Sequence, residues 1–301
     1  MMQLRGLYTA LVTPFAENGS IDRGSLKRLV DFQIANGVDG LVPVGSTGES
    51  PTVSHTENIE VIEEVIRYAD GRIPVIAGTG SNSTAEAVRM TKQAAAIGAA
   101  ASLQVAPYYN RPTQEGLYRH FCTIADETGL PLIIYNIPGR TACNITPETI
   151  QRISRNSQVI GIKEAAGSIP QAMEIISQRP KNFGVVAGDD NLTLPLIQLG
   201  ADGVISVASN LIPGHMQQLV TAALKDQVET ARSLHYQLLP LFKALFWETN
   251  PIPIKYALAS RGIIAHNRLR LPLTELAPEL HAAMDELLKS TPVEPLHATA
   301  E

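Results

Sequence analysis

The sequence predicts an α/β protein, a (β/α)8 TIM barrel with a C-terminal helical appendage. Eight short apolar runs rich in β-branched residues alternate with segments of helical period. The starts of consecutive runs lie 19 to 34 residues apart, which is the length of a strand, a crossover helix and two short loops. This alternation favours a parallel sheet, and eight such units favour its closure into a barrel.

The expected strands are short, and signals for helix starts separate them. In chain order they are Tyr8–Val12, Gly40–Val44, Pro74–Ala77, Ser102–Ala106, Leu132–Tyr135, Val159–Ile162, Val185–Ala187 and Val204–Val207. Ser54 and Glu57 form an S-x-x-E capping box, which marks a helix N-terminus. A second box is predicted for Ser83 and Glu86, and residues 146–147 combine a threonine cap with a proline at the first helical position.

After residue 207 the strand pattern stops and helical periodicity continues. Helices are expected at Met216–Leu224, Val228–Leu245, Ile254–Ser260 and Thr274–Leu288. We interpret residues 1–225 as the catalytic barrel and residues 226–290 as a helical region packed on it. Residues 291–301 contain two prolines and no apolar period, so a flexible tail is expected there.

Composition argues against several classes of partner. The 24 Lys and Arg residues against 29 Asp and Glu give a formal net charge of -5, and no basic run occurs, so a nucleic-acid partner is not expected. The uncharged stretch 93–110 is broken by glycine and proline, so no membrane span is expected. Cys122 and Cys143 are too few for a disulfide scaffold, which fits free thiols in the reducing cytoplasm.

In a closed parallel barrel the active site lies where the strands end, and Lys163 is the lysine there. It follows directly after the apolar strand Val159–Ile162, where an ammonium is costly unless it is paired or deprotonated. A lysine that forms a Schiff base needs such a site, because only the free amine attacks a carbonyl. The structural alternative is that the lysine leaves the strand and pairs with Glu164.

Other strand ends carry hydroxyls and one guanidinium. Gly45–Gly48 offers two hydroxyls and consecutive backbone N–H groups, which suit a carboxylate or phosphate, or simply form a tight turn. Tyr135 is suited to relay protons or to pack, and Arg140 is suited to bind a carboxylate or to form a surface salt bridge. Asp189 and Asp190 are expected as capping carboxylates at the barrel rim. No metal or other cofactor is expected, since the histidines lack ligand spacing.

Several of these segments together resemble the pyruvate-dependent class I aldolase family. The resemblance covers nearly the whole chain, from Gly6 to about Leu288. The segments that carry it are Gly45–Ser50, Tyr108–Pro112, Tyr135–Thr141, Gly161–Ala165 and Asn250–Lys255. Several separate motifs in the same order are a specific signal, whereas each alone is weak.

The resemblance implies a reaction and a role for each matching residue. Lys163 is expected to form an imine with pyruvate, while Tyr135, Ser46 and Tyr109 from a neighbouring subunit relay protons. The expected second substrate is L-aspartate 4-semialdehyde, in the diaminopimelate route to lysine. The enamine attacks its aldehyde, and its amine then closes a ring. The resemblance further implies a homotetramer.

The resemblance also assigns the two substrate carboxylates. Thr47 and the backbone around Ile205 are expected to hold the carboxylate of pyruvate, and Arg140 that of the semialdehyde. Ser46 departs from the threonine more usual in this branch, because serine is common in sialic-acid lyases, while Arg140 favours a small dianionic product. The alternatives are another pyruvate aldolase, such as N-acetylneuraminate lyase or 2-keto-3-deoxygluconate aldolase, and a non-catalytic keto-acid or amino-acid sensor.

Feedback by lysine is a last implication. In sensitive relatives lysine binds between subunits, and the matching positions here are Ser50, Pro51, His55, Asn58, Asn82, Glu86 and Tyr108. Pro51 replaces a small alanine and Asn58 replaces a histidine, so the resemblance implies a weakened site. Glu86 suits an ammonium, although it is also expected in a helix cap.

Overall fold

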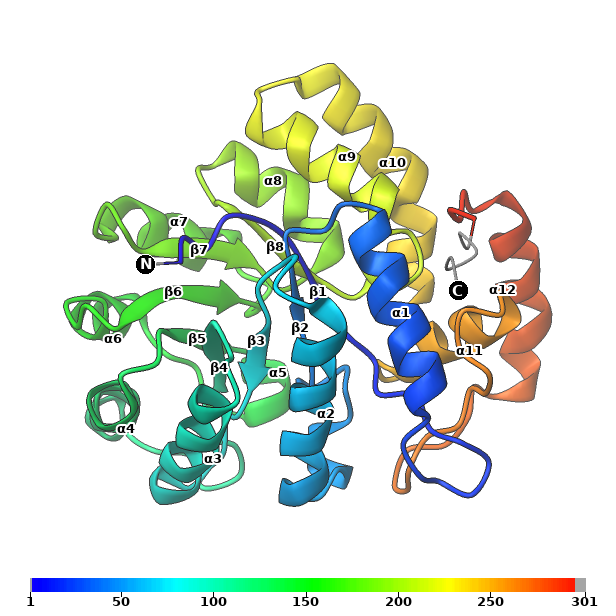
Figure 1. Cartoon of the computed structure of the whole chain (residues 1–301). Helices are drawn as coiled ribbons and strands as arrows, with labels where there is room; N and C mark the ends of the chain where they lie inside the picture. The colour runs from blue at the N-terminus through cyan, green and yellow to red at the C-terminus, as the bar shows by residue number, and fades with distance from the viewer. Residues whose placement is uncertain (1, 296–301) are drawn as a thin grey trace.

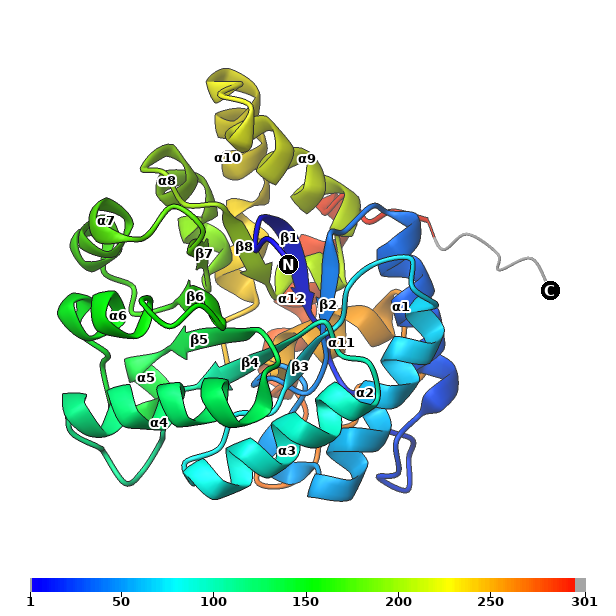
Figure 2. The ribbon, with the colours of Figure 1, turned by 60° about the vertical axis from the view of Figure 1, so that its left-hand side comes forward.

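The computed structural model describes residues 2–295 and shows a barrel of parallel strands surrounded by helices (Figures 1 and 2). The hydrogen-bonded strand order is β2-β1-β8-β7-β6-β5-β4-β3. A parallel bridge between Leu41 and Val75 closes the sheet from β2 to β3. The predicted (β/α)8 architecture is therefore confirmed.

Each expected strand is present, and its ends differ from the prediction by at most two residues. The strands are β1 (Gly6–Ala10), β2 (Gly40–Val42), β3 (Ile76–Gly78), β4 (Ala101–Val105), β5 (Leu132–Asn136), β6 (Val159–Glu164), β7 (Gly184–Ala187) and β8 (Gly203–Ser206). Their residues are buried almost throughout because one face fills the barrel and the other packs against helices. The inner face includes Tyr8, Val42, Ile76, Leu103, Ile133, Tyr135, Val186 and Ile205.

The helices between the strands begin close to the predicted signals. They are α1 (Arg23–Ala35), α2 (His55–Ala69), α3 (Thr84–Ala96), α4 (Gln114–Thr128), α5 (Pro138–Thr141), α6 (Pro147–Ile153), α7 (Ile169–Gln178), α8 (Thr193–Gln198) and α9 (Pro213–Leu224). The capping box of Ser54 and Glu57 is confirmed, as is the cap by Thr146. The second box is wrong, because the Ser83 side chain makes no cap bond and Glu86 pairs with His55.

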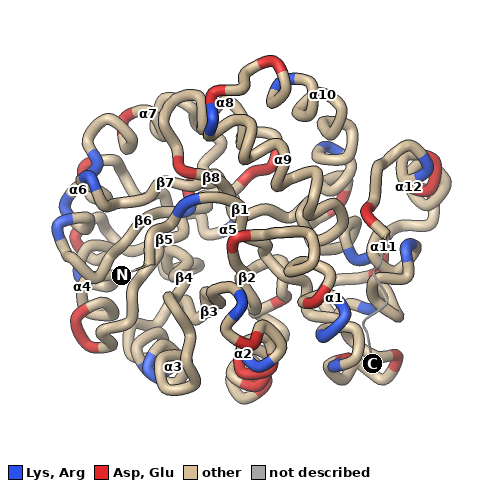
Figure 3. The backbone as a smooth tube through the Cα atoms, turned by 45° about the horizontal axis from the view of Figure 1, so that its top comes forward, with Lys and Arg blue, Asp and Glu red and all other residues tan. Residues whose placement is uncertain are grey.

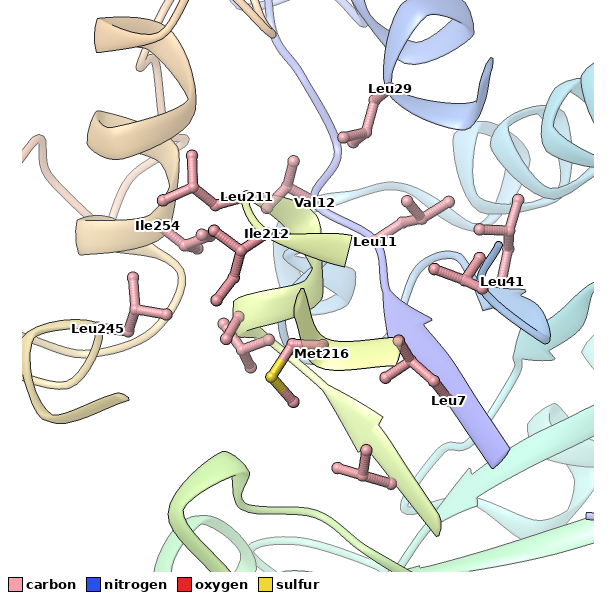
Figure 4. Packing of buried hydrophobic residues seen from close by; sticks show 14 of the residues in the cluster. Leu7, Leu11, Val12, Leu29, Leu41, Leu211, Ile212, Met216, Leu245 and Ile254 are labelled. Atoms are coloured by element: carbon pink, nitrogen blue, oxygen red, sulfur yellow. The ribbon is translucent and has the colours of Figure 1, made fainter. Parts of the chain in front are cut away.

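The helical appendage shares the main apolar core of the barrel. It consists of α10 (Val228–Ala244), α11 (Ile252–Ser260) and α12 (Pro278–Ser290), the last of which starts four residues later than expected. Figure 4 shows Leu245 and Ile254 of this region close to Leu211 and Ile212, which follow β8. α11 is thereby fixed against the barrel, whereas the exact boundary predicted at residue 225 remains an interpretation.

The chain beyond α12 is docked over its first residues. The Glu294 carboxylate accepts hydrogen bonds from the backbone N–H of His215, at 2.8 Å, and from its Nδ1, at 2.6 Å. Val293 packs against the main core. Glu294 thus satisfies an N–H in the first turn of α9, while the flexibility of this segment stays a prediction. Residues 296–301 of that prediction lie outside the described residues.

The outer surface carries charges of both signs. Lysines, arginines, aspartates and glutamates are interspersed along the helices (Figure 3). Within residues 2–295, no helix has both the length and the apolar character that crossing a membrane requires.

Candidate active site

Lys163 and Tyr135 lie side by side at the C-terminal ends of neighbouring strands. They are register partners on β6 and β5, and the Lys163 Nζ lies 4.3 Å from the centroid of the Tyr135 ring. Each residue is only 5% exposed. The register shifts at Ile160, which is an extra residue relative to β5. This bulge places Ile162 against the outer helices, so the next side chain, Lys163, turns to the barrel interior.

Glu164 points away from Lys163, so the structural alternative for the lysine is wrong. Its carboxylate accepts hydrogen bonds from Asn136 Nδ2 at 3.1 Å and from the Ala166 N–H at 2.7 Å. Within residues 2–295 no ion pair joins Lys163 to Glu164, because successive strand residues face opposite sides. Burial raises the pKa of the Glu164 carboxyl, and the hydrogen bonds from Asn136 oppose this rise.

The two loops that follow β6 and β7 leave room for the Lys163 side chain. A Cβ at Gly188 would lie 3.1 Å from the Lys163 Cε and 2.5 Å from the Ala165 Cβ. Burial raises the pKa of the Asp189 carboxyl, and the Lys163 ammonium opposes that rise. Asp190 is buried and accepts hydrogen bonds from the backbone N–H groups of Val207 and Ala208, which begin a short helical turn after β8, so it acts as the expected capping carboxylate.

The Gly45–Ser50 loop after β2 presents Ser46 and Thr47. Thr47 is buried, and its Oγ1 accepts a hydrogen bond of 2.9 Å from Asn250 Nδ2. Turn bonds within the loop and a 2.7 Å bond from the Thr13 hydroxyl to the Gly48 carbonyl fix its path. The segment is therefore a tight turn as well as a candidate carboxylate site, and the two interpretations are compatible.

Ser46 and Arg140 line one cavity of about 290 Å³ at the mouth of the barrel. Arg140 lies on α5, and its Nη2 donates a hydrogen bond of 2.9 Å to the backbone carbonyl of Asn250, which also lines the cavity. Within residues 2–295 Arg140 makes no ion pair, so the alternative of a surface salt bridge inside this chain is wrong. An uncompensated guanidinium in a cavity suits an anionic ligand.

Two predicted site residues have different surroundings. Ile205 on β8 is completely buried in the inner face of the barrel. Tyr109 is 91% exposed, so within this chain it is not brought to Lys163. Its neighbour Tyr108 lines the cavity that contains Ser46.

Three residues at the site had no role in the sequence interpretation. Asn250 contacts both Thr47 and Arg140, and Lys255 forms an ion pair with Glu49 at 2.5 Å between completely buried side chains. A lysine inside the apolar segment 252–258 is the signal that could have found this pair, because a buried ammonium needs a partner.

A second cavity, of about 420 Å³, gathers most of the positions matched to a lysine site. Its lining includes Ser50, Pro51, His55, Asn58, Glu86 and Tyr108. Asn82 lies beside it and donates a 3.1 Å hydrogen bond to the Tyr108 carbonyl. Glu86 pairs with His55 at 3.1 Å, and the buried Oδ1 of Asn58 has no partner within the described residues.

The chain is similar to known proteins over nearly its whole length. The model of the dihydrodipicolinate synthetase family matches residues 3–291. A 4-hydroxy-tetrahydrodipicolinate synthase from Sulfurihydrogenibium sp. (strain YO3AOP1) is 50% identical over 285 residues, 94% of this chain and 97% of that protein. Chloride-inhibited dihydrodipicolinate synthase from Acinetobacter baumannii, complexed with pyruvate, is 43% identical with a TM-score of 0.93, covering 95% of this chain and 98% of that chain. DHDPS from Cyanidioschyzon merolae with lysine bound is 38% identical with a TM-score of 0.92, covering 95% and 97%.

Proposed function

This chain belongs to the dihydrodipicolinate synthetase family, and on that basis we propose that Lys163 forms the imine through which it acts on pyruvate. The activity is that of a 4-hydroxy-tetrahydrodipicolinate synthase, a lyase of the diaminopimelate route to lysine. The relatives do not favour a sialic-acid lyase, a ketodeoxygluconate aldolase or a sensor. The observation that carries the proposal is the buried Lys163 amine, which lies against Tyr135 with no carboxylate ion pair within residues 2–295.

The covalent steps balance without a cofactor. The Lys163 amine attacks the carbonyl carbon of pyruvate, and loss of one water gives the imine. Loss of a proton from the methyl carbon gives the enamine, whose carbon attacks the aldehyde of L-aspartate 4-semialdehyde. This attack re-forms the imine, and the aldehyde oxygen takes up a proton and becomes a hydroxyl. The amine of that substrate then attacks the imine carbon and closes the ring. The bond from that carbon to the Lys163 nitrogen breaks, the substrate nitrogen loses two protons, and the Lys163 nitrogen takes up two.

The neighbouring residues supply protons and bind the carboxylates. Tyr135 and Ser46 relay protons to and from the reacting carbon and oxygen atoms, together with Tyr109 of the partner subunit. Thr47 and the backbone around Ile205 bind the carboxylate of pyruvate. These roles are supported by the contact of Tyr135 with Lys163 and by the fixed loop that carries Ser46 and Thr47.

Arg140 binds the carboxylate of L-aspartate 4-semialdehyde, because its guanidinium faces the cavity without an ion pair among the described residues.

We also infer a homotetramer in the cytoplasm, and a regulatory amino-acid site in the 420 Å³ cavity that contains Glu86. The relative crystallised with lysine bound supports this last assignment.

Reduction with borohydride in the presence of pyruvate tests the imine. We expect one pyruvate-derived unit on the peptide that contains Lys163, found by peptide mass mapping. Lys163→Ala should lose activity by at least about a thousandfold while it stays folded. Labelling of another peptide, or retained activity in this variant, would contradict the proposal.

A further inference from the structure

A completely buried ion pair joins the Gly45–Ser50 loop to the helical appendage. The Lys255 Nζ of α11 lies 2.5 Å from the Glu49 Oε1, and both side chains are 0% exposed. The other carboxylate oxygen accepts a hydrogen bond of 3.1 Å from the backbone N–H of Arg270. The Phe15 ring covers the ammonium, with its centroid 4.2 Å from the Nζ. Burial lowers the pKa of Lys255 to about 8, and the neighbouring Glu49 carboxylate opposes this fall.

The loop held by this pair has an unfavourable backbone. Glu49 has a φ of 56° and Val44 a φ of 52°, so two residues with side chains adopt the left-handed conformation on either side of Gly45–Gly48. Such conformations persist only where surrounding contacts impose them, and they concentrate at functional sites. The bonds from Lys255 and Arg270 are contacts of this kind on Glu49.

A second tie runs between the same two segments. Asn250, five residues before Lys255, donates to the Thr47 Oγ1 at 2.9 Å, two residues before Glu49. A hydroxyl that accepts from an amide still has its own proton to donate. The Asn250 contact therefore turns the Thr47 proton away from the amide and leaves it for a ligand oxygen. The backbone carbonyl of Asn250 also accepts from Arg140.

We propose that Asn250–Lys255 is a positioning segment for the pyruvate site: its two ties hold the Gly45–Glu49 loop so that the Thr47 hydroxyl faces the pyruvate carboxylate. The side chains of Lys255 and Glu49 are completely buried, so they act through the loop and not on the substrate, although Glu49 contributes to the wall of the cavity that contains Ser46. The inference rests on the proposed function, in which Thr47 binds that carboxylate.

The cost of a buried ion pair supports a role beyond stability. Two charges taken out of water lose their hydration, so a well-packed apolar pair is often as stable as the ion pair that it replaces. A pair with fixed geometry does, however, define one position for the loop, which an apolar contact does not. Positioning of Thr47 is therefore what the Glu49–Lys255 pair adds.

Two variants and a control separate positioning from stability. Glu49→Gln with Lys255→Met removes both charges together and nearly preserves side-chain volume, so no unpaired charge is buried. Asn250→Ala removes the second tie alone and keeps the carbonyl that binds Arg140. The control is Asp202→Asn, which removes the negative charge that pairs with Arg179 at the opposite end of the barrel, where β8 begins.

The readout is the KM for pyruvate beside kcat, the melting temperature and borohydride trapping at saturating pyruvate. We expect pyruvate KM to rise roughly tenfold in the double variant and in Asn250→Ala, with labelling of Lys163 retained. Asp202→Asn should lower the melting temperature and leave pyruvate KM within about twofold of the wild type. If the double variant does not fold, Asn250→Ala decides the question.

A pyruvate KM within about twofold of the wild type in Asn250→Ala, or in the folded double variant, would overturn the inference. An equal rise in Asp202→Asn would also overturn it, since destabilisation alone would then explain the change. Wild-type labelling at a residue other than Lys163 would instead overturn the proposed function, so the two failures are distinguishable.

Discussion

Arg140 presents a guanidinium to the cavity that it shares with Ser46, and among residues 2–295 this guanidinium hydrogen-bonds a backbone carbonyl and no carboxylate. We predict that Arg140→Ala lowers kcat/KM for L-aspartate 4-semialdehyde by roughly 10- to 100-fold, because a charge-assisted bidentate contact is lost. Arg140→Lys should recover only part of this, since an ammonium cannot bind a carboxylate in the same fork. Initial rates at varied semialdehyde measure the effect.

Pyruvate KM is the internal control for this prediction. It should change little in Arg140→Ala, because the proposed site for the first substrate is formed by Thr47 and the backbone near Ile205. An unchanged specificity constant for the semialdehyde would contradict the assignment of Arg140.

Single residues differ in how far the sequence could place them. Lys163 and Tyr135 were predicted to lie at the same site because both stand at the C-terminal ends of adjacent predicted strands. The orientation of Glu164 was left open, since a bulge at Ile160 resets which side each residue of β6 faces. The Glu49–Lys255 pair was missed because its members are 206 residues apart and only the packed appendage brings them together.

At the scale of elements, local chemistry predicted the strands and most helix starts. Each of the eight strands was placed within two residues, because a short apolar run between turn residues needs no long-range information. The capping box of Ser83 failed because Glu86 has stronger partners: Ser81, and His55 on the preceding helix. Competition of this kind depends on the packing of α2 against α3, which the local pattern does not contain.

The segment after α11 is fixed to α2 by a single arginine. Arg270 donates to both carboxylate oxygens of Glu57, at 2.6 and 2.9 Å, and to the backbone carbonyls of Gly19 and Thr52. The hydrogen bonds from Arg270 lower the pKa of Glu57 from 4.5 to about 2. A depressed carboxyl pKa stabilises the folded state above pH 4.5, and this contribution is lost as the pH falls toward 2.

We predict that Glu57→Gln lowers the free energy of unfolding at pH 7 by about 1 to 2 kcal/mol, a value reduced for solvent screening. The difference from the wild type should shrink below about pH 4.5, because the wild-type carboxylate then loses its advantage. Urea unfolding at pH 7 and at pH 3.5 measures both values. Glu229→Gln, which removes an exposed pair with Arg232, is the control. A difference that does not depend on pH would contradict the assignment.

At the scale of the whole molecule, the appendage completes the site. Its apolar residues belong to the same core as β1, β8 and α9, and Figure 4 shows Ile254 and Leu245 beside Leu211 and Ile212. The sequence predicted that the appendage packs on the barrel but not where, because helical periodicity defines a buried face and not its partner. Asn250 and Lys255 acquire their roles from that docking.

The 420 Å³ cavity predicts a response to lysine. Glu86 is suited to bind an ammonium, but it already pairs with His55 at 3.1 Å, and Asn58 offers an amide with a free buried oxygen within the described residues. We therefore expect weak inhibition that appears at millimolar lysine, followed by activity and by calorimetry. Glu86→Gln should abolish the binding and leave the uninhibited rate nearly unchanged. If the wild type neither binds lysine nor is inhibited, the assignment of a lysine site to this cavity is wrong, and the Glu86–His55 pair only joins α2 to α3.

The exposed ring of Tyr109 leads us to predict a contact with a partner subunit. It is 91% exposed, yet its loop is fixed, because Asn82 donates to the Tyr108 carbonyl at 3.1 Å and Asn110 donates to the Asn82 carbonyl at 2.8 Å. An ordered loop holds this large aromatic side chain in solvent. Its burial against another chain would be energetically favourable. The proposed relay needs its hydroxyl near Lys163, which this chain does not provide by itself.

Complementation between one impaired and one inactive variant tests whether Tyr109 acts across the interface. Tyr109→Phe keeps the ring and removes the hydroxyl, so its kcat should fall by roughly 10- to 100-fold with the oligomer intact. Lys163→Ala has the hydroxyl but no amine. When the two are dissociated and reassembled together, a mixed pair contains one site with Lys163 from one chain and Tyr109 from the other, and activity should rise above that of either variant. If Tyr109 served its own chain, mixing would restore nothing, and a fully active monomer by sedimentation would exclude the interface role.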